Sequence, residues 1–416
     1  MRLSQSRRPD SSAALLVAAA VVALTAGAAP AADVVVVRGD VLHTMAGPPI
    51  TDGVVVIEDG TIRAVGPAAT TPLPAHAKVL RGAVVTPGLV DAHSVVGLAG
   101  HLNQPQDQDQ LDTAEAIQPE LRALDAYNPQ ERLIEWLRGF GITTIHTGHG
   151  PGALVSGQTM VVKLAGTTVE EAVLVPTAMV AVTLGDAARR NGGDGDTKSP
   201  GTRSKAVAML RAELVKAQEY RRKRAHADAA KQPDVDLGLE TMARVVDGTL
   251  PLLVTADRAH DIASALRIAE EFDIRVVLDS AAEAYLLTDR IKAAGVPVIV
   301  HPTMRRAGGG GETENLSFEN AATLRAAGIP VALQSGYESY VPKTRVVLLE
   351  AGLASAHGLT FEQALAAVTI DAATIIGVAD RVGSLAVGKD GDVAIYDGDP
   401  FEYTTHCTGV LIDGVV

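Results

Sequence analysis

The sequence predicts an α/β protein in which a parallel (β/α)8 barrel lies between two β-rich chain ends. Between residues 89 and 380, short apolar runs such as "LPLLVTAD", "IRVVLDS" and "VPVIVHP" alternate with helical segments. That alternation is typical of parallel βα units. The segment has room for eight units of ordinary size. At both ends, Val/Ile runs are separated by Gly-Asp turns, which indicates hairpins and a second, smaller β-domain.

The first 32 residues predict a signal peptide. Arg2, Arg7 and Arg8 form a positive segment, "AALLVAAAVVALTAGAA" is an apolar run, and the small residues of "APAA" precede Asp33. A retained membrane anchor is the alternative, but the run is short for a membrane span and ends in small residues. We therefore expect an exported protein, periplasmic or extracellular, without a stable membrane anchor after cleavage.

The smaller β-domain is expected from residues 33–88 and 381–416, with residues 89–380 as the barrel between them. The helices of the barrel are expected to be amphipathic. In "DIASALRIAEEF" the apolar residues Ile262, Ala265, Leu266 and Ala269 follow the spacing of one helix face.

Composition narrows the classes of partner. The chain is 47% hydrophobic and 20% charged, with a formal net charge of −13 and one cysteine, Cys407. An acidic chain without a basic patch argues against nucleic acid and anionic membranes as partners. A lone cysteine excludes an internal disulfide. A small-molecule ligand remains the expected partner, and self-association or association with another subunit stays open.

Three long segments carry a resemblance to a known family. They are "VVTPGLVDAH" at 84–93, "GITTIHTGHGPGALVSGQTMVVKLAG" at 141–166 and "GLTFEQALAAVTIDAATIIGVADRVGSLAVGKDGDVAIYDGDP" at 358–400. They resemble the amidohydrolase superfamily, in particular its imidazolonepropionase-like, exported branch. The resemblance implies a (β/α)8 TIM barrel with a β-sandwich built from both chain ends. It also implies hydrolysis of a cyclic amide or related non-peptide C–N bond by water activated on one or two divalent metals.

The resemblance can be checked at the metal-ligand positions of that family. His93 matches the first of them. The other four positions carry Val95, Thr255, Ser280 and Gly336. A catalytic zinc site normally needs three protein ligands, and Thr, Ser and Val bind transition metals poorly. The sequence therefore predicts a degenerate metal site, weak or no turnover, and no bound cofactor.

Lys163 is the second candidate metal residue, on the resemblance alone. It falls near the position where some relatives carry a carboxylated lysine that bridges two metals, in the segment "MVVKLAG". Other relatives keep a lysine there without that role.

Two functional interpretations stay open. In the first, the chain is a non-catalytic protein that binds a periplasmic small molecule or a partner. In the second, a hydrolase has rebuilt its site, with Asp257 and His301 as candidate catalytic residues and with Zn²⁺ or Mn²⁺ as the metal. Asp257 shares the strand phase of Thr255 and is expected to point inward. Asp279 is out of phase with Ser280 and is expected to point away.

His146 and His149, in "IHTGHGPG", also have two interpretations. They follow the strand "GITTI", so they are expected at its carboxyl end. Either they contact a ligand, or they pack in the loop with a hydrogen bond to the backbone, which is the commoner situation.

Overall fold

The computed structural model describes residues 34–102, 104–190, 200–304, 311–337 and 346–416. Residues Asp33–Val416 form one compact unit by their contacts. The predicted signal peptide lies outside the described residues. Among the described helices, none is long and apolar enough to cross a membrane.

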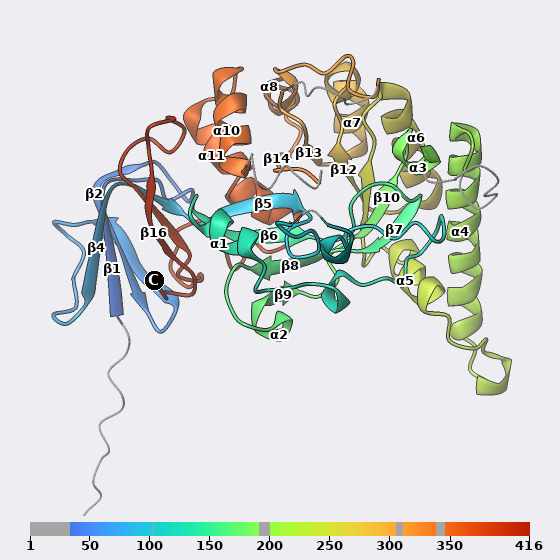
Figure 1. Ribbon diagram of the computed structural model, residues 1–416, viewed down its shortest axis with the longest axis horizontal. Helices are drawn as coiled ribbons and strands as arrows, with labels where there is room; N and C mark the ends of the chain where they lie inside the picture. Colours follow the sequence, from blue (N-terminus) through green and yellow to red (C-terminus); the bar gives the residue numbers. More distant parts are fainter. Residues whose placement is uncertain (1–33, 103, 191–199, 305–310, 338–345) are drawn as a thin grey trace, which may run out of the picture. The chain divides into compact units, whose positions relative to one another are not determined.

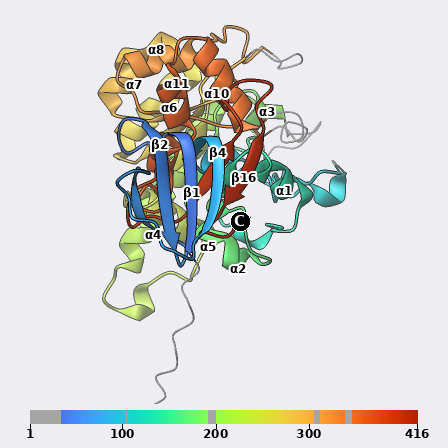
Figure 2. The ribbon, with the colours of Figure 1, turned by 90° about the vertical axis from the view of Figure 1, so that its left-hand side faces the viewer.

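Both chain ends contribute to one six-stranded sheet, with the order β16-β15-β4-β1-β2-β3 (Figure 2). Its strands are β1 (Val34–Leu42), β2 (Ile50–Glu58), β3 (Thr61–Pro67), β4 (Lys78–Pro87), β15 (Val393–Tyr396) and β16 (Cys407–Leu411). Alternate residues of the Val-rich runs, such as Val35, Val37 and Val55, are buried in one apolar cluster. A second face-packed sheet, which a sandwich requires, is not seen among the described strands, so the sandwich stays a prediction.

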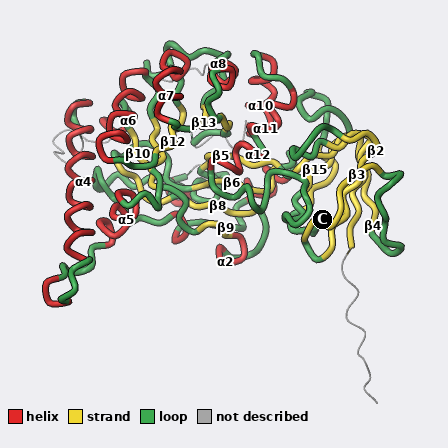
Figure 3. Tube along the Cα trace, turned by 180° about the vertical axis from the view of Figure 1, so that it is seen from behind, coloured by secondary structure: helices red, strands yellow, loops and turns green. Residues whose placement is uncertain are grey.

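The middle of the chain forms two further sheets (Figure 3). One has the order β14-β13-β12-β11-β10-β7, and the other has the order β5-β6-β8-β9. The strands are β5 (Leu89–Ser94), β6 (Ile142–Thr147), β7 (Val155–Gln158), β8 (Met160–Lys163), β9 (Val173–Val175), β10 (Val180–Thr183), β11 (Leu252–Thr255), β12 (Val276–Ser280), β13 (Val298–Val300) and β14 (Val331–Leu333). Successive strands from β10 to β14 pair in parallel.

Helices follow the strands along the chain, as the alternating pattern predicts (Figure 1). They are α1 (Arg132–Arg138), α2 (Val169–Ala172), α3 (Ala187–Arg190), α4 (Arg203–Arg224), α5 (Leu237–Val246), α6 (Ala259–Phe272), α7 (Thr288–Ala294), α8 (Asn320–Ala326), α10 (Val347–Ala356), α11 (Phe361–Ala367) and α12 (Ile370–Ile375). The predicted amphipathic helix is α6, whose Ile262, Ala265 and Leu266 are buried. The mixed α/β class is confirmed.

The two middle sheets are linked at both margins. Only Thr159 separates β7 from β8, and an isolated parallel bridge joins Ser94, at the end of β5, to Gly336 after β14. The described strands nevertheless form two separate sheets and not one continuous eight-stranded barrel.

One face of these strands carries a layer of apolar side chains. The side chains that follow it toward the carboxyl ends of the strands point to the same side. Val90, Leu253, Val277, Ile299 and Ala332 come from five strands and form one buried cluster with α12. Side chains two residues apart share a strand face. The residues two positions further along β11, β12, β13 and β14 therefore point to the same side at the carboxyl ends: Thr255, Asp279, His301 and Gln334.

Candidate active site

The carboxylate of Asp279 is the centre of a buried polar cluster at the strand ends. Its Oδ2 accepts a hydrogen bond from Thr255 Oγ1 at 2.6 Å, and its Oδ1 accepts from Gln334 Nε2 at 2.7 Å. Its Oδ1 also lies 2.9 Å from Nδ1 of His93. Asp279, His93 and Gln334 are all at most 1% exposed. Residues of β5, β11 and the end of β14 thus converge on one carboxylate of β12.

The expectation that Asp279 points away from the site is therefore wrong. Its orientation was predicted from the phase of Ser280, but Ser280 and Ala281 have φ values of 66° and 56°. Regular alternation ends before a residue in this left-handed region. Asp279 keeps the phase of Val277, whereas Ser280 is turned by the backbone.

His93 and Asp279 hold each other in charged forms. Burial alone would lower the pKa of His93, but the charge and hydrogen bond of Asp279, helped by Asp91, raise it overall. Burial opposes ionisation of Asp279, yet His93, Thr255 and Gln334 lower its pKa. Since Nδ1 of His93 faces Asp279, its Nε2 points away from that pair. No hydrogen-bond partner reaches Nε2 from the described residues.

Asp91 contacts the backbone of His93. Its Oδ1 accepts from the backbone N–H of Ser335 at 3.0 Å and of His93 at 3.4 Å. Complete burial raises its pKa to about 6, against these hydrogen bonds. Asp91 therefore ties β5 to the chain just after β14 and fixes the backbone from which His93 projects.

The two candidate catalytic residues, Asp257 and His301, meet through Ser280. Ser280 Oγ lies 2.7 Å from Asp257 Oδ1 and 2.7 Å from the backbone oxygen of His301. The backbone N–H of Ala282 also donates to Asp257 Oδ1, at 3.3 Å. Burial raises the pKa of Asp257 to about 7, with a further contribution from Glu312, against the hydrogen bonds and the charge of His301.

An aromatic ring lies between His93 and His301. The ring centroid of Tyr337 is 6.1 Å from that of His93 and 5.5 Å from that of His301. We use the term strand-end site for His93, Asp257, Asp279, Ser280, His301 and Gln334. It contains one acid with a raised pKa, Asp257, and one with a lowered pKa, Asp279, as sites that move protons often do.

The residues at the family's metal positions do not fit a metal. Val95 is aliphatic and buried, and Gly336 has no side chain. The hydroxyl of Thr255 is bonded to Asp279, and that of Ser280 lies between Asp257 and the His301 carbonyl. Within the described ranges, no three His, Cys, Asp or Glu side chains are grouped so as to hold a metal ion.

Lys163 has a different environment from the one its resemblance implies. Its Nζ lies 2.7 Å from Asp390 and 2.9 Å from Asp392, and it also pairs with Asp413. Burial would lower the pKa of Lys163, but these carboxylates raise it overall. Among the described residues, the ammonium thus pairs with carboxylates of the C-terminal segment and not with the surroundings of His93.

The two histidines of "IHTGHGPG" have different surroundings. His146 Nδ1 lies 2.8 Å from the Ala92 oxygen, and its Nε2 lies 2.6 Å from Thr159 Oγ1. Burial lowers its pKa to about 3, so it is a neutral packing residue. Both ring nitrogens of His149 are buried without a hydrogen-bond partner in the described structure. The Gln110 carbonyl, which accepts a hydrogen bond from Gly150 N–H, lies beside this ring.

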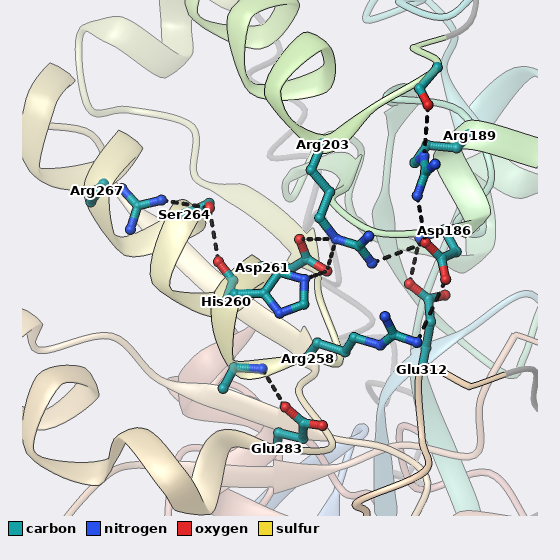
Figure 4. A network of polar contacts seen from close by, with 12 residues as sticks. Asp186, Arg189, Arg203, Arg258, His260, Asp261, Ser264, Arg267, Glu283 and Glu312 are labelled. Atoms are coloured by element: carbon teal, nitrogen blue, oxygen red, sulfur yellow. Dashed lines mark hydrogen bonds and ion pairs between the residues drawn. The ribbon is translucent and has the colours of Figure 1, made fainter.

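A charged network lies beyond the carboxyl end of β10, at the starts of α4 and α6 (Figure 4). Arg203, at the start of α4, lies 3.0 Å from both Asp261 of α6 and Asp186 after β10. Arg258 points to Asp186 at 3.9 Å, and the Asp186 backbone donates to Glu312. Neither this network nor Gln334 was predicted from the sequence. Strand phase with Ala332 could have identified Gln334, but the network joins residues whose spacing carries no signal.

A cavity of the described structure lies elsewhere. It has a volume of about 810 Å³ and is lined by residues at the starts of the strands, among them Pro251, Arg275, Pro297 and Pro330. No residue of the strand-end site lines it. The polar chemistry and this cavity are therefore at opposite ends of the same strands.

Comparisons with known proteins agree with the fold. The model described as "Amidohydrolase family" matches residues 98–416. An imidazolonepropionase of Rhizorhabdus wittichii is 26% identical over 86% of this chain and 91% of its own length. Amidohydrolase tasK of Hapsidospora irregularis is 25% identical over 87% of this chain, which spans only 39% of that relative. The structure of an amidohydrolase from Thermotoga maritima superimposes with a TM-score of 0.86 at 28% identity, over 92% of this chain and 98% of its own.

Proposed function

Because this chain belongs to the amidohydrolase family, we propose that it binds a small amide-like molecule at the strand-end site without the family's catalytic metal. The observation that carries this proposal is the position of Asp279. Its carboxylate takes hydrogen bonds from Thr255, Gln334 and His93, so the strand ends are joined by hydrogen bonds in place of metal coordination. The amide class follows from the chemistry of the related hydrolases.

We also propose the finer architecture that the family implies. The Ser94–Gly336 bridge and the single residue between β7 and β8 support a closed eight-stranded barrel over residues 89–380. Residues 33–88 and 381–416 would form the accompanying β-sandwich. The six-stranded sheet that both chain ends share would be one of its two layers. A crystal structure that showed an open sheet would contradict this architecture.

Hydrolysis at a rebuilt site is the second candidate function. It is favoured by one observation: Asp257, with a pKa of about 7, lies in the same site as His93. A carboxyl that is half protonated near neutral pH suits general acid–base catalysis of C–N bond hydrolysis. Ionised Asp257 would take a proton from water, and the charged His93 would give one from Nε2 to the departing nitrogen.

Elemental analysis of the mature protein tests the proposed function. The protein is purified without chelators and then challenged with Zn²⁺ and Mn²⁺ while thermal unfolding is followed. We expect metal far below one equivalent per chain and no rise in Tm. Bound metal near one equivalent, lost in His93→Ala, would refute the proposal and favour a rebuilt metal site.

We propose an exported location for the protein, on the strength of the N-terminal signal-peptide pattern. Arg2, Arg7 and Arg8 precede an apolar run that ends in small residues. Mass spectrometry of the protein recovered from periplasm and medium should give a chain that begins at Ala32 or Asp33. A full-length chain in the membrane fraction would contradict cleavage.

A further inference from the structure

Asp257 is oriented by its surroundings so that one carboxyl oxygen is held and the other is not. Both of its side-chain hydrogen bonds, with Ser280 Oγ and Ala282 N–H, are made by Oδ1. No described hydrogen bond reaches Oδ2. Ser280, Ala281 and Ala282 are buried, whereas Asp257 keeps part of its surface exposed. The carboxyl is therefore held through Oδ1, which we call the inner oxygen, while Oδ2, the outer oxygen, has no hydrogen bond from the described residues.

The left-handed turn at the end of β12 makes this arrangement. Two consecutive non-glycine residues, Ser280 and Ala281, have positive φ values. Such backbone is costly and is kept where the surrounding structure requires it, often at functional sites. Here it places Ser280 Oγ and Ala282 N–H on the same oxygen of Asp257.

Counting protons shows which form of Asp257 fits. Ser280 Oγ is 2.7 Å from two acceptors, Asp257 Oδ1 and the His301 carbonyl, but a hydroxyl has one proton to donate. Both contacts are hydrogen bonds only if Asp257 supplies the second proton. The proton then lies on Oδ1 and is donated to Ser280 Oγ, which donates to His301. The raised pKa of Asp257 agrees with this form.

The neighbouring charges do not compete for the outer oxygen. Arg258, the next residue, points to Asp186, as Figure 4 shows. Glu283 accepts from Ala259 N–H and from Asn315. Glu312 and His301 act on Asp257 through their charges, in opposite directions. With the proton on the inner oxygen, Oδ2 is an uncharged carbonyl-type acceptor.

We propose that Asp257 is a ligand-binding residue whose outer oxygen accepts a hydrogen bond from the N–H group of a neutral amide bound at the strand-end site. Two buried polar atoms of the same site, His93 Nε2 and Gln334 Oε1, have no hydrogen-bond partner in the described structure. The inference rests on the proposed function and adds the group that is recognised.

Three small ring compounds of similar size separate the alternatives: pyrrolidinone, N-methylpyrrolidinone and protonated pyrrolidine. The first has a neutral N–H, the second has none, and the third is a cation. Their Kd values for the full mature protein, by calorimetry or ligand-observed NMR, should rank pyrrolidinone about tenfold tighter than the N-methyl compound, the value of one hydrogen bond. Equal binding of the two lactams, preference for pyrrolidine, or no binding of pyrrolidinone would overturn the proposal.

Substitutions of Asp257 give the matched control. In Asp257→Asn the amide N–H can donate to Ser280, and the amide oxygen takes the place of Oδ2. Only the long contact from Ala282 is lost. We expect this variant to bind pyrrolidinone within about threefold of wild type, and Asp257→Leu to lose about tenfold. Unchanged binding in Asp257→Leu, with native thermal unfolding, would overturn the proposal.

A direct observation of the proton complements the binding data. Infrared difference spectra of wild type against Asp257→Asn, at slightly acid pH, should contain a carboxylic-acid C=O band. Its absence would overturn the protonated form. Metal analysis of the same samples keeps the two hypotheses apart, because bound metal would refute the proposed function without altering the ranking of the lactams.

Discussion

Asp279 is the residue on which the strand-end site depends most. It is fully buried, and three donors from other strands end on its carboxylate. Removal of one member of a buried charged pair leaves the others without partners, which costs far more than a lost surface contact.

We expect Asp279→Ala to lower the free energy of unfolding by about 3–5 kcal/mol, because His93, Thr255 and Gln334 lose their common acceptor. Urea unfolding at neutral pH measures the effect. Thr255→Val, which removes one of the three hydrogen bonds, is the control and should cost about 1 kcal/mol. Similar stability of Asp279→Ala and wild type would show that this network does not hold the strand ends together.

Asp257 should make stability depend on pH. Its folded-state pKa is raised from 3.8 to about 7, mainly by burial. Between these values the folded protein holds a proton that the unfolded chain has released, so wild-type stability falls as pH rises through this window. Asp257→Asn cannot ionise, so its stability relative to wild type should increase from pH 4 to pH 7. Urea unfolding at several pH values would show this trend, and a constant difference would contradict it.

At the scale of elements, the helices and strands could be predicted from the sequence better than the turns that connect them. The amphipathic spacing of α6 and the apolar strand runs follow from periodicities of 3.6 and 2, which a single sequence displays. The turn at Ser280 and Ala281 does not, since neither residue is a glycine that would signal a positive φ. That one turn decided the orientation of Asp279 and hence the centre of the site.

Two ion pairs join α4 to α6, and they differ in how deeply their carboxylates are buried. Arg203 bonds Asp261, whose side chain is 4% exposed, whereas Arg211 and Glu271 are both more than 40% exposed. We expect Arg203→Ala to lower the free energy of unfolding by about 2–3 kcal/mol, since a buried carboxylate loses its partner. Arg211→Ala should leave stability unchanged within error, because exposed pairs contribute little.

Thermal or urea unfolding of the two variants, side by side, checks this prediction. Arg203 also reaches Asp186 beside the strand ends, so the same variant should weaken binding of a ligand at the strand-end site. Equal effects of Arg203→Ala and Arg211→Ala would mean that burial of Asp261 does not matter.

For the whole molecule, the resemblance to a known family was enough to predict the fold class and the family. The contacts between residues of the strand-end site could be identified only from the structure. His93 could be identified because it stands within "VVTPGLVDAH". Its partner Asp279 is 186 residues away along the chain, and no local pattern links the two. The same holds for Lys163, whose carboxylate partners are more than 220 residues away.

Lys163 joins the middle of the chain to its C-terminal segment. Its ammonium is almost fully buried between Asp390, Asp392 and Asp413, of which Asp392 is itself 3% exposed. Removing the cation leaves a buried carboxylate beside two others, so repulsion adds to the loss of the ion pairs. The molecule then has to unfold this junction or take up protons on the carboxyl groups.

We expect Lys163→Met to lower the free energy of unfolding by about 3–5 kcal/mol without any change in metal content. Asp413→Asn is the control, because Asp413 is 48% exposed and one partner of three, and its effect should be much smaller. Urea unfolding and elemental analysis on the same preparations give both quantities. A stable Lys163→Met protein that had lost bound metal would reverse the assignment, since Lys163 would then serve a metal centre and not the junction between chain segments.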